Sequence, residues 1–405
     1  MPPLSTVCVV GLGYVGLSTA ATLAKAGHRV IGVDVNPTIR ETINAGAIHI
    51  AEPGLEDLVR TAVASAMLRA EARPVQADTF LICVPTPIRQ EGGTLTPDIR
   101  HVLSAARSIA PVLQPGSLVV IESTCPVGTT ERVRDELLEA GAPVHEIHLA
   151  YCPERVLPGK ILDELVANDR IIGGLDLASA DAAERFYRIF VQGALISTDS
   201  RTAEMVKLVE NSFRDVNIAF ANEISVLCDH LGIDPWEVID LANRHPRVHV
   251  LQPGPGVGGH CIAVDPWFIV AQDPATARLI RTAREVNDDK ADWVIGRILE
   301  RAATIASAID RPVRVACLGL AYKPDVDDLR ESPALRVALA LAAAGIDVLA
   351  CEPNIQSHPM LVLVDVETAI AEADIVAVLV KHAGFAGLDL SDKVVLDFCG
   401  LTVRP

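Results

Sequence analysis

Short runs of apolar residues recur along the chain and alternate with segments whose apolar positions follow a helical period. In the N-terminal half these runs predict five strands: Thr6–Val10, Arg29–Val33, Thr79–Val84, Ser117–Ile121 and Ile147–Tyr151. Apolar runs without alternation are typical of parallel strands that are covered on both faces. A helix is expected over Leu17–Ala26, between the first two strands. The pattern therefore predicts an α/β domain.

The second half begins with a long amphipathic segment that predicts one helix from Arg201 to about Leu231, capped by Asp199–Ser200. Further helices are expected over Pro235–Asn243 and over about 274–305. Four more apolar runs then predict strands: Arg314–Gly319, Asp347–Cys351, Ala373–Val380 and Lys393–Phe398. The fold class is α/β, with two Rossmann-like domains that have parallel sheets and are joined by a long central helix. The expected domain boundaries are 1–198, 199–308 and 309–405.

The first predicted strand runs into Gly11-Leu-Gly13-Tyr14-Val15-Gly16, and the second strand ends in Asp34. Gly11 permits a tight turn, Gly13 lets the backbone approach a pyrophosphate, and Gly16 lets the helix pack on the strand. A carboxylate at Asp34 accepts hydrogen bonds from the adenosine ribose and repels a 2′-phosphate. These residues predict an NAD site.

Three polar residues follow later strands of the first predicted sheet: Thr86, Thr124 and Glu154. Ligands of open parallel sheets bind beyond the carboxyl ends of the strands. Turn chemistry alone explains any one of these residues. Together they indicate an active-site rim.

The segment Leu251–Phe268, LQPGPGVGGHCIAVDPWF, shows neither helical nor strand periodicity. Its glycines allow close approach of the backbone to a ligand, and the thiol of Cys261 precedes the carboxylate of Asp265 by four residues. A thiolate is a strong nucleophile, so the loop fits a covalent catalyst. The alternative is a buried structural cysteine on a tight turn.

Three further groups of residues, each containing Lys or Arg, have two possible interpretations. Lys207 lies one turn before Asn211 on the long helix, where it is either a partly desolvated catalytic lysine or a lysine at the helix edge. Lys323 and Arg330 follow a C-terminal strand, either as phosphate contacts or as surface charges. The arginines of the later helix are expected on a solvated or interface face: Arg278, Arg281 and Arg284.

The formal net charge of −17 argues against nucleic-acid binding, which needs a basic surface. Nine cysteines without a CxxC pair or metal-ligand spacing favour a reduced, cytoplasmic protein without a metal site. No apolar run is long enough to span a membrane.

Taken together, these motifs resemble the UDP-glucose/GDP-mannose dehydrogenase family over essentially the whole chain. The resemblance rests on GLGYVG, ESTCPVGTT, YCPER, EMVKLVENSFRDVNIAFANE, the GGHC loop and KPDVDDLRESP. Within the family, YCPERVLPGK, NRHPRV and GPGVGGHCIAVDPWFIVAQ are most similar to members that oxidise UDP-N-acetyl-D-mannosamine. The UDP-glucose enzymes usually carry a lysine directly before the loop aspartate, where this chain has Val264.

The resemblance implies a four-electron oxidation of a nucleotide sugar at C6, in which two NAD molecules act one after the other. The product would serve the synthesis of polysaccharide precursors. Cys261 forms a thiohemiacetal and then a thioester, and water releases the uronate. It also implies that Lys207 and Asp265 transfer protons and stabilise the negative charge that develops on the substrate oxygen. Asn211 would donate a hydrogen bond to that oxygen, and Thr124 and Glu154 would position or activate water.

The remaining implied contacts are with the two ligands and with a partner subunit. The resemblance implies that NAD contacts the glycine-rich turn, which includes Tyr14 and Val15. Further implied NAD contacts are Asp34, Thr86, Thr124 and Arg330. The UDP-sugar is implied to contact Glu154, Arg155, Lys207, Asn211, Gly258 and Lys323. Arg244 or Arg247 touches the sugar or a partner subunit's substrate. The family also implies a homodimer built on the long central helix.

Other functions stay open. One is the same oxidation of UDP-glucose, UDP-N-acetylglucosamine or GDP-mannose. A second is a two-electron hydroxyacid dehydrogenase, which needs neither Cys261 nor the C-terminal domain. A third is a sensor of nucleotide sugars that retains the folds without catalysis.

Overall fold

The computed structural model describes residues 5–91, 94–309 and 311–402. The chain forms two compact units, which divide between Val209 and Glu210, within the long helix α8 (Ser200–Leu231). The helix expected from Arg201 is thus present, and Asp199 caps it by accepting a hydrogen bond from the Thr202 N–H. The expected division into three domains stays a prediction. Among the described residues, no helix combines the length and apolarity needed to cross a membrane.

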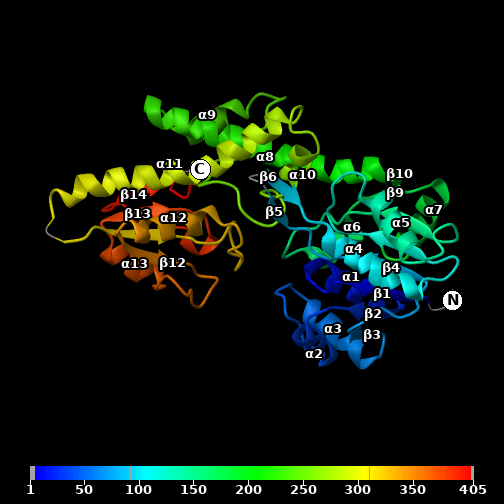
Figure 1. The fold of residues 1–405 in the computed structure, drawn as a ribbon. Coiled ribbons are helices and arrows are strands. Elements are labelled where there is room, and N and C mark those ends of the chain that lie inside the picture. The colour runs from blue at the N-terminus through cyan, green and yellow to red at the C-terminus, as the bar shows by residue number, and fades with distance from the viewer. Residues whose placement is uncertain (1–4, 92–93, 310, 403–405) are drawn as a thin grey trace. The chain divides into compact units, whose positions relative to one another are not determined.

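The first unit is built around an eight-stranded sheet of order β10-β9-β8-β7-β4-β1-β2-β3 (Figure 1). Its strands are β1 (Thr6–Val10), β2 (Arg29–Val33), β3 (Leu68–Glu71), β4 (Thr79–Ile82), β7 (Leu118–Ile121), β8 (His148–Tyr151), β9 (Arg170–Gly174) and β10 (Leu195–Asp199). All five strands predicted from the sequence are present, three of them shorter than expected. The strands β3, β9 and β10 were not predicted.

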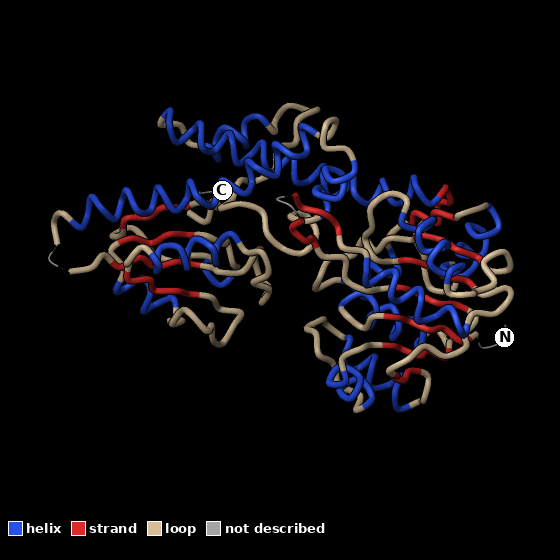
Figure 2. The backbone as a smooth tube through the Cα atoms, in the orientation of Figure 1, coloured by secondary structure: helices blue, strands red, loops and turns tan. Residues whose placement is uncertain are grey.

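The strand β9 runs antiparallel to β8, with Tyr151 opposite Gly173, whereas the other pairs of this sheet are parallel. The first sheet is therefore parallel-dominated, and its one antiparallel pair involves β9, a strand that the sequence did not predict. A two-stranded hairpin of β5 (Ile88–Glu91) and β6 (Thr94–Pro97) forms a separate antiparallel pair (Figure 2).

Helices cover both faces of the first sheet, which explains the unbroken apolar runs of its strands. Val7 and Val9 belong to one hydrophobic cluster, while Cys8 and Val10 belong to the other. The helices of this unit are α1 (Tyr14–Lys25), α2 (Pro37–Asn44), α3 (Leu55–Ala64), α4 (Arg100–Ile109) with the 3-10 turn η1 (Ala110–Val112), α5 (Thr129–Glu139), α6 (Ile161–Ala167) and α7 (Leu177–Tyr187). The first helix starts three residues before its predicted start.

The second unit contains a four-stranded parallel sheet of order β12-β11-β13-β14. Its strands are β11 (Arg314–Leu318), β12 (Asp347–Cys351), β13 (Ile375–Val378) and β14 (Val394–Asp397). Its helices are α9 (Pro235–Ala242), α10 (Asp265–Gln272), α11 (Arg278–Ala306), α12 (Pro333–Ala343), α13 (Val366–Glu372) and the 3-10 turn η2 (Ala383–Phe385). Hydrophobic clusters again lie on both faces of the sheet. The α/β class with two parallel-dominated sheets and a long helix is confirmed.

Two details of the second unit correct the sequence prediction. The segment Leu251–Phe268 is irregular only up to Val264, because α10 begins at Asp265, where Pro266 fits the first turn. Arg284 does not lie on a solvated face of α11. It is buried and pairs with Asp215, with 2.6 Å between Nη1 and Oδ1, because Asp215 on α8 supplies the opposite charge.

Candidate active site

The glycine-rich turn between β1 and α1 leaves open space where a dinucleotide is expected. Gly11 has φ +94°, and a Cβ on it would lie 2.5 Å from the Cys83 carbonyl oxygen. A Cβ on Gly16 would lie 1.9 Å from the Gly11 oxygen, whereas one on Gly13 would meet nothing within 4 Å. Gly13 caps α1 without a side-chain hydrogen bond, and Tyr14 and Val15 form the first turn. This uncapped helix end fits an anionic pyrophosphate.

Asp34 is fixed at the carboxyl end of β2. Its Oδ2 accepts a hydrogen bond of 3.0 Å from the Leu12 N–H, and its Oδ1 accepts one of 2.9 Å from the Asn36 N–H. Each carboxylate oxygen keeps a second lone pair, which can accept a ribose hydroxyl. The residues of this turn therefore fit NAD.

Three neighbouring strands, β4, β7 and β8, bring Thr86, Thr124 and Glu154 to the same edge of the first sheet. The Thr86 hydroxyl donates a hydrogen bond of 2.7 Å to the Thr124 carbonyl, which ties two of these loops together. The sequence prediction of a polar rim therefore agrees with the topology. The catalytic roles of its residues stay predictions.

Glu154 is buried and paired with Arg170, the first residue of β9. Arg170 Nη1 donates to Glu154 Oε2 over 2.8 Å, and the Arg155 N–H donates to Glu154 Oε1 over 2.6 Å. Arg170 reaches this rim because the antiparallel β9 begins where β8 ends. The sequence reasoning missed Arg170, although an arginine that opens the apolar run Ile171–Gly174 was a signal.

A second buried carboxyl, Glu122, lies beside this pair. It accepts a hydrogen bond of 2.6 Å from the Tyr187 hydroxyl and one of 3.2 Å from the Cys83 thiol. Burial raises the pKa of Glu122, and the Arg170 guanidinium opposes that rise. The buried Arg170 guanidinium thus interacts with two buried carboxyl groups at the rim, those of Glu154 and Glu122. The sequence did not reveal this arrangement.

In the second unit, Asn211 on α8 and Asp265 at the start of α10 are both buried and directly bonded. The Asn211 side-chain amide donates to Asp265 Oδ2 over 2.5 Å. Lys207, which is also buried, lies one turn before Asn211 on α8. This burial favours a partly desolvated lysine over a lysine at the helix edge.

Cys261 heads the turn that leads into α10. Its carbonyl oxygen accepts hydrogen bonds from the Val264 N–H (3.0 Å) and the Asp265 N–H (2.8 Å). Of the nine cysteines, all of which lie in described residues, only Cys261 is exposed. This exposure contradicts the alternative of a buried structural cysteine.

The glycines before Cys261 pack closely against the loop that follows β11. A Cβ on Gly258 would lie 2.4 Å from the Glu331 carbonyl oxygen, and one on Gly259 would lie 2.7 Å from the Tyr322 ring. The Gly259 N–H donates to the Arg330 carbonyl over 3.1 Å. These contacts explain why glycines are needed here.

A chain of buried amides holds the start of the same loop. Asn222 on α8 accepts a hydrogen bond of 2.9 Å from the Gly254 N–H and donates one of 2.8 Å to Asn287 on α11. Asn287 in turn donates to Asp215, the partner of Arg284. The sequence reasoning did not single out Asn222 or Asn287, whose pairing depends on how the two helices pack.

The second unit also contains a cavity of about 1500 Å³, lined by α9, the loop of Pro253–Gly256 and residues beyond β11, β13 and β14. Arg244 and Lys323 line it, and their role as substrate contacts stays a prediction. Arg247 is exposed and is not part of the lining among the described residues. Arg330 forms a bidentate ion pair with Asp328, in which Nε donates to Oδ1 over 2.9 Å and Nη2 to Oδ2 over 2.6 Å.

Three models of one family match the chain. The NAD binding domain of the UDP-glucose/GDP-mannose dehydrogenase family matches residues 5–191, its central domain 201–289, and its UDP binding domain 316–403. UDP-N-acetyl-D-mannosamine dehydrogenase of Escherichia coli K12 is 51% identical over 98% of this chain and 99% of its own.

Two other similar proteins bear on fold and substrate. The NDP-N-acetyl-D-galactosaminuronic acid dehydrogenase of Ralstonia nicotianae is 51% identical, over 98% of this chain and 96% of its own. The structure of a UDP-N-acetyl-D-mannosamine dehydrogenase from Pyrococcus horikoshii has a TM-score of 0.90 at 36% identity, over 99% and 96% of the two chains.

Proposed function

The chain belongs to the UDP-glucose/GDP-mannose dehydrogenase family, and from that premise we propose that it oxidises UDP-N-acetyl-D-mannosamine at C6 to UDP-N-acetyl-D-mannosaminuronate with NAD. The observation that carries the proposal is identity of about half the residues over nearly the full length of a UDP-N-acetyl-D-mannosamine dehydrogenase. The exposed Cys261 and the open glycine turn support a catalyst over a sensor.

The chemistry proposed for the first step is removal of two electrons from the C6 alcohol. NAD, when bound, would supply the hydride acceptor for each of the two oxidations, one NAD after the other. Gly11, Gly13, Gly16 and Asp34 would hold it. Lys207 takes the hydroxyl proton, and Asn211 donates a hydrogen bond to the oxygen that becomes the aldehyde carbonyl.

The Cys261 thiol carries the second half of the reaction. Its sulfur adds to the aldehyde carbon while its proton goes to the carbonyl oxygen, which gives a thiohemiacetal. Loss of a hydride from C6 and of the hydroxyl proton gives a thioester. Water, positioned by Thr124 and Glu154, then cleaves the carbon–sulfur bond, which yields the carboxylate, the free thiol and a proton.

Asp265 is proposed to act together with Lys207 in transferring protons and in balancing the charge that develops on the substrate oxygen. Its bond from Asn211 supports this role, because it fixes the amide and the carboxylate relative to each other. The exposed turn at Cys261 supports the nucleophile, since the sulfur must reach a bound sugar.

We also propose that the protein is a cytoplasmic homodimer built on α8. Six large apolar residues of that helix are exposed at helical spacing: Met205, Val209, Phe213, Phe220, Leu227 and Leu231. Such a stripe is typical of a helix that packs against a partner. Nine free cysteines suit a reducing compartment.

The test is the number of NADH formed per sugar, with UDP-N-acetylmannosamine, UDP-N-acetylgalactosamine, UDP-N-acetylglucosamine and UDP-glucose each limiting. Two NADH per UDP-N-acetylmannosamine, with slower turnover of the others, is the expected result. Preference for the galactosamine sugar would favour the activity of the Ralstonia relative. One NADH per sugar would refute the four-electron route.

A further inference from the structure

The second sheet has its topological switch point between β11 and β13. From β11 the chain crosses to β12 on one side and then to β13 on the other. Ligands of open α/β sheets bind beyond the carboxyl ends of the strands at such a point. Lys323 follows β11 by five residues and Lys381 follows β13 by three, so one lysine lies on each side of the crevice.

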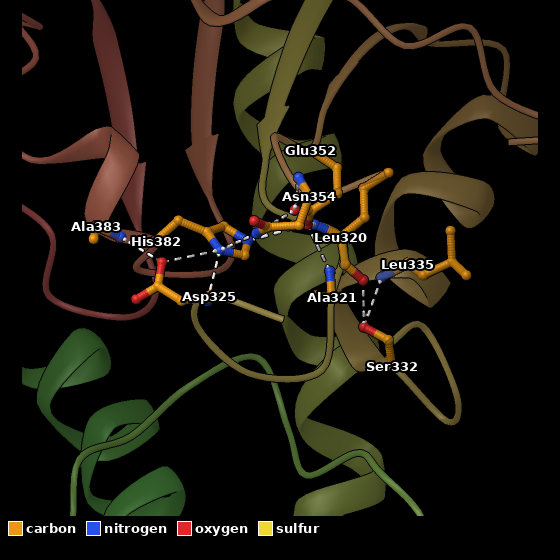
Figure 3. Close-up of polar contacts among 9 residues, drawn as sticks. All are labelled: Leu320, Ala321, Asp325, Ser332, Leu335, Glu352, Asn354, His382 and Ala383. Carbon is orange, nitrogen blue, oxygen red and sulfur yellow. Dashed lines mark hydrogen bonds and ion pairs between the residues drawn. The ribbon is translucent and has the colours of Figure 1, made fainter. Parts of the chain in front are cut away.

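Two backbone N–H groups at this crevice already donate hydrogen bonds to a side chain of the protein. The carboxylate of Glu352 accepts hydrogen bonds from the N–H groups of Leu320 (2.8 Å) and Ala321 (2.9 Å) (Figure 3). These positions match Leu12 and Gly13 of the first unit, where Asp34 accepts from Leu12. Glu352 therefore holds two backbone N–H groups of this turn, which are not available to a phosphate.

Buried neighbours hold Glu352 in this position. His382 lies 3.0 Å from Glu352 through Nε2, and its Nδ1 accepts a hydrogen bond of 2.9 Å from the Asp325 N–H (Figure 3). Nε2 must therefore carry the proton and donate to Glu352. Ser332 caps α12 by accepting from the Leu335 N–H, so this helix end is also occupied. An anion at the crevice must be met by side-chain cations.

The cavity beside the crevice has walls of different charge. Asp234 caps α9, Glu237 and Asp240 lie on it, and Arg244 beyond its end pairs with Asp240, whereas Lys323 and Lys381 line the cavity from the ends of the strands. Lys381 Nζ donates a hydrogen bond of 2.7 Å to the Gly400 carbonyl, which orders the side chain. An ammonium group has three donors, so two remain for a ligand as far as the described residues are concerned.

We propose that Lys381 is a second cationic contact for the diphosphate of the nucleotide sugar, opposite Lys323. This inference rests on the proposed function, since it assigns the nucleotide part of that substrate to the cavity. Lys381 then contributes to substrate binding and has no part in the chemistry at C6.

The experiment measures binding of UDP, UMP and uridine to the full-length protein by isothermal titration calorimetry. Lys381→Met should raise the Kd for UDP about tenfold, weaken its dependence on salt and leave the Kd for uridine unchanged, while Lys381→Arg should restore most of the affinity. Lys393→Met is the control, because Lys393 also donates to backbone carbonyls but precedes β14 at the other edge of the sheet.

The outcomes separate this inference from the proposed function. Unchanged UDP binding by Lys381→Met, or an equal loss for UDP and uridine, would overturn the assignment of Lys381 to the diphosphate. Absence of UDP binding by the unaltered protein would instead count against the proposed function. Thermal unfolding of each variant shows whether a loss of affinity reflects a loss of folded protein.

Discussion

Arg170 donates a hydrogen bond of 2.8 Å to Glu154, and both side chains are almost completely buried. The two residues come from β9 and from the loop after β8, which meet because β9 is reversed. Glu154 is a predicted water-positioning residue, so Arg170 is placed to fix its orientation.

Arg170→Met should destabilise the protein by about 3–5 kcal/mol, because it leaves the buried Glu154 carboxylate without its cation. In the protein that still folds, we expect kcat to fall more than tenfold with little change in KM for the sugar. Arg188→Met is the control. Arg188 forms an exposed ion pair with Glu184, and such pairs contribute about 0–1 kcal/mol.

Urea unfolding and steady-state kinetics measure these effects at one pH. Partial recovery of kcat by added guanidinium would show that the charge acts on Glu154, since a purely structural defect would not respond. A normal kcat in folded Arg170→Met protein would exclude the positioning role.

Two glycines of the NAD turn should respond in opposite ways to alanine. A Cβ at Gly13 meets nothing within 4 Å, so Gly13→Ala should change the free energy of unfolding by less than about 1 kcal/mol but raise KM for NAD. Gly16→Ala should reduce the stability severely, because its Cβ would lie 1.9 Å from the Gly11 oxygen. Chemical unfolding and NAD titration distinguish the two. Unchanged NAD binding by Gly13→Ala would argue against a pyrophosphate at this turn.

Cys261 should be the first cysteine to react with iodoacetamide. Burial raises the pKa of the thiols of Cys152 and Cys317 to about 12, so little thiolate is present at neutral pH, and the chain around them shields both. Peptide mass spectrometry after brief alkylation gives the site, and NADH formation gives the effect. Cys261→Ser should resist inactivation by the reagent and should form no uronate. Uronate at the normal rate from that variant would rule out the thioester.

Lys290 should make the stability depend on pH. It is buried between α8 and α11, where its ammonium group donates to the Ser225 hydroxyl over 2.6 Å and lies 4.0 Å from the Trp293 ring centre. Burial lowers the pKa of Lys290 from 10.5 to about 7, although Asp229 opposes this shift. Between these values the unfolded chain binds more protons, so stability rises with pH, by at most about 1.4 kcal/mol per unit.

Urea unfolding of the unaltered protein and of Lys290→Met at pH 7 and pH 9 tests this sign. The unaltered protein should gain stability relative to the variant as the pH rises. Lys25→Met, at an exposed position of α1, should show no such trend. A constant difference between the protein and Lys290→Met would contradict the lowered pKa.

The sequence predicted nine of the strands and the long helix because their apolar runs and periodicity are local signals. The glycine turn and the Cys261 loop were likewise evident from residue type and spacing. Arg170 and Asn222 were not, because their partners lie on other elements. Glu154 meets Arg170 only through the reversal of β9, and Asn222 meets Asn287 only through the packing of α8 on α11. The burial of Arg284 was mispredicted for the same reason, since a helical spacing of arginines does not reveal an aspartate on another helix.

The reversed strand β9 also affects which parts of the rim can change independently. Thr86, Thr124 and Glu154 are carried by connecting segments, whose lengths vary easily in proteins. Arg170 enters the rim as the opening residue of a strand with neighbours on both sides, β8 and β10. Insertions in the surrounding loops can therefore reshape the rim while the Arg170 guanidinium stays at the start of β9.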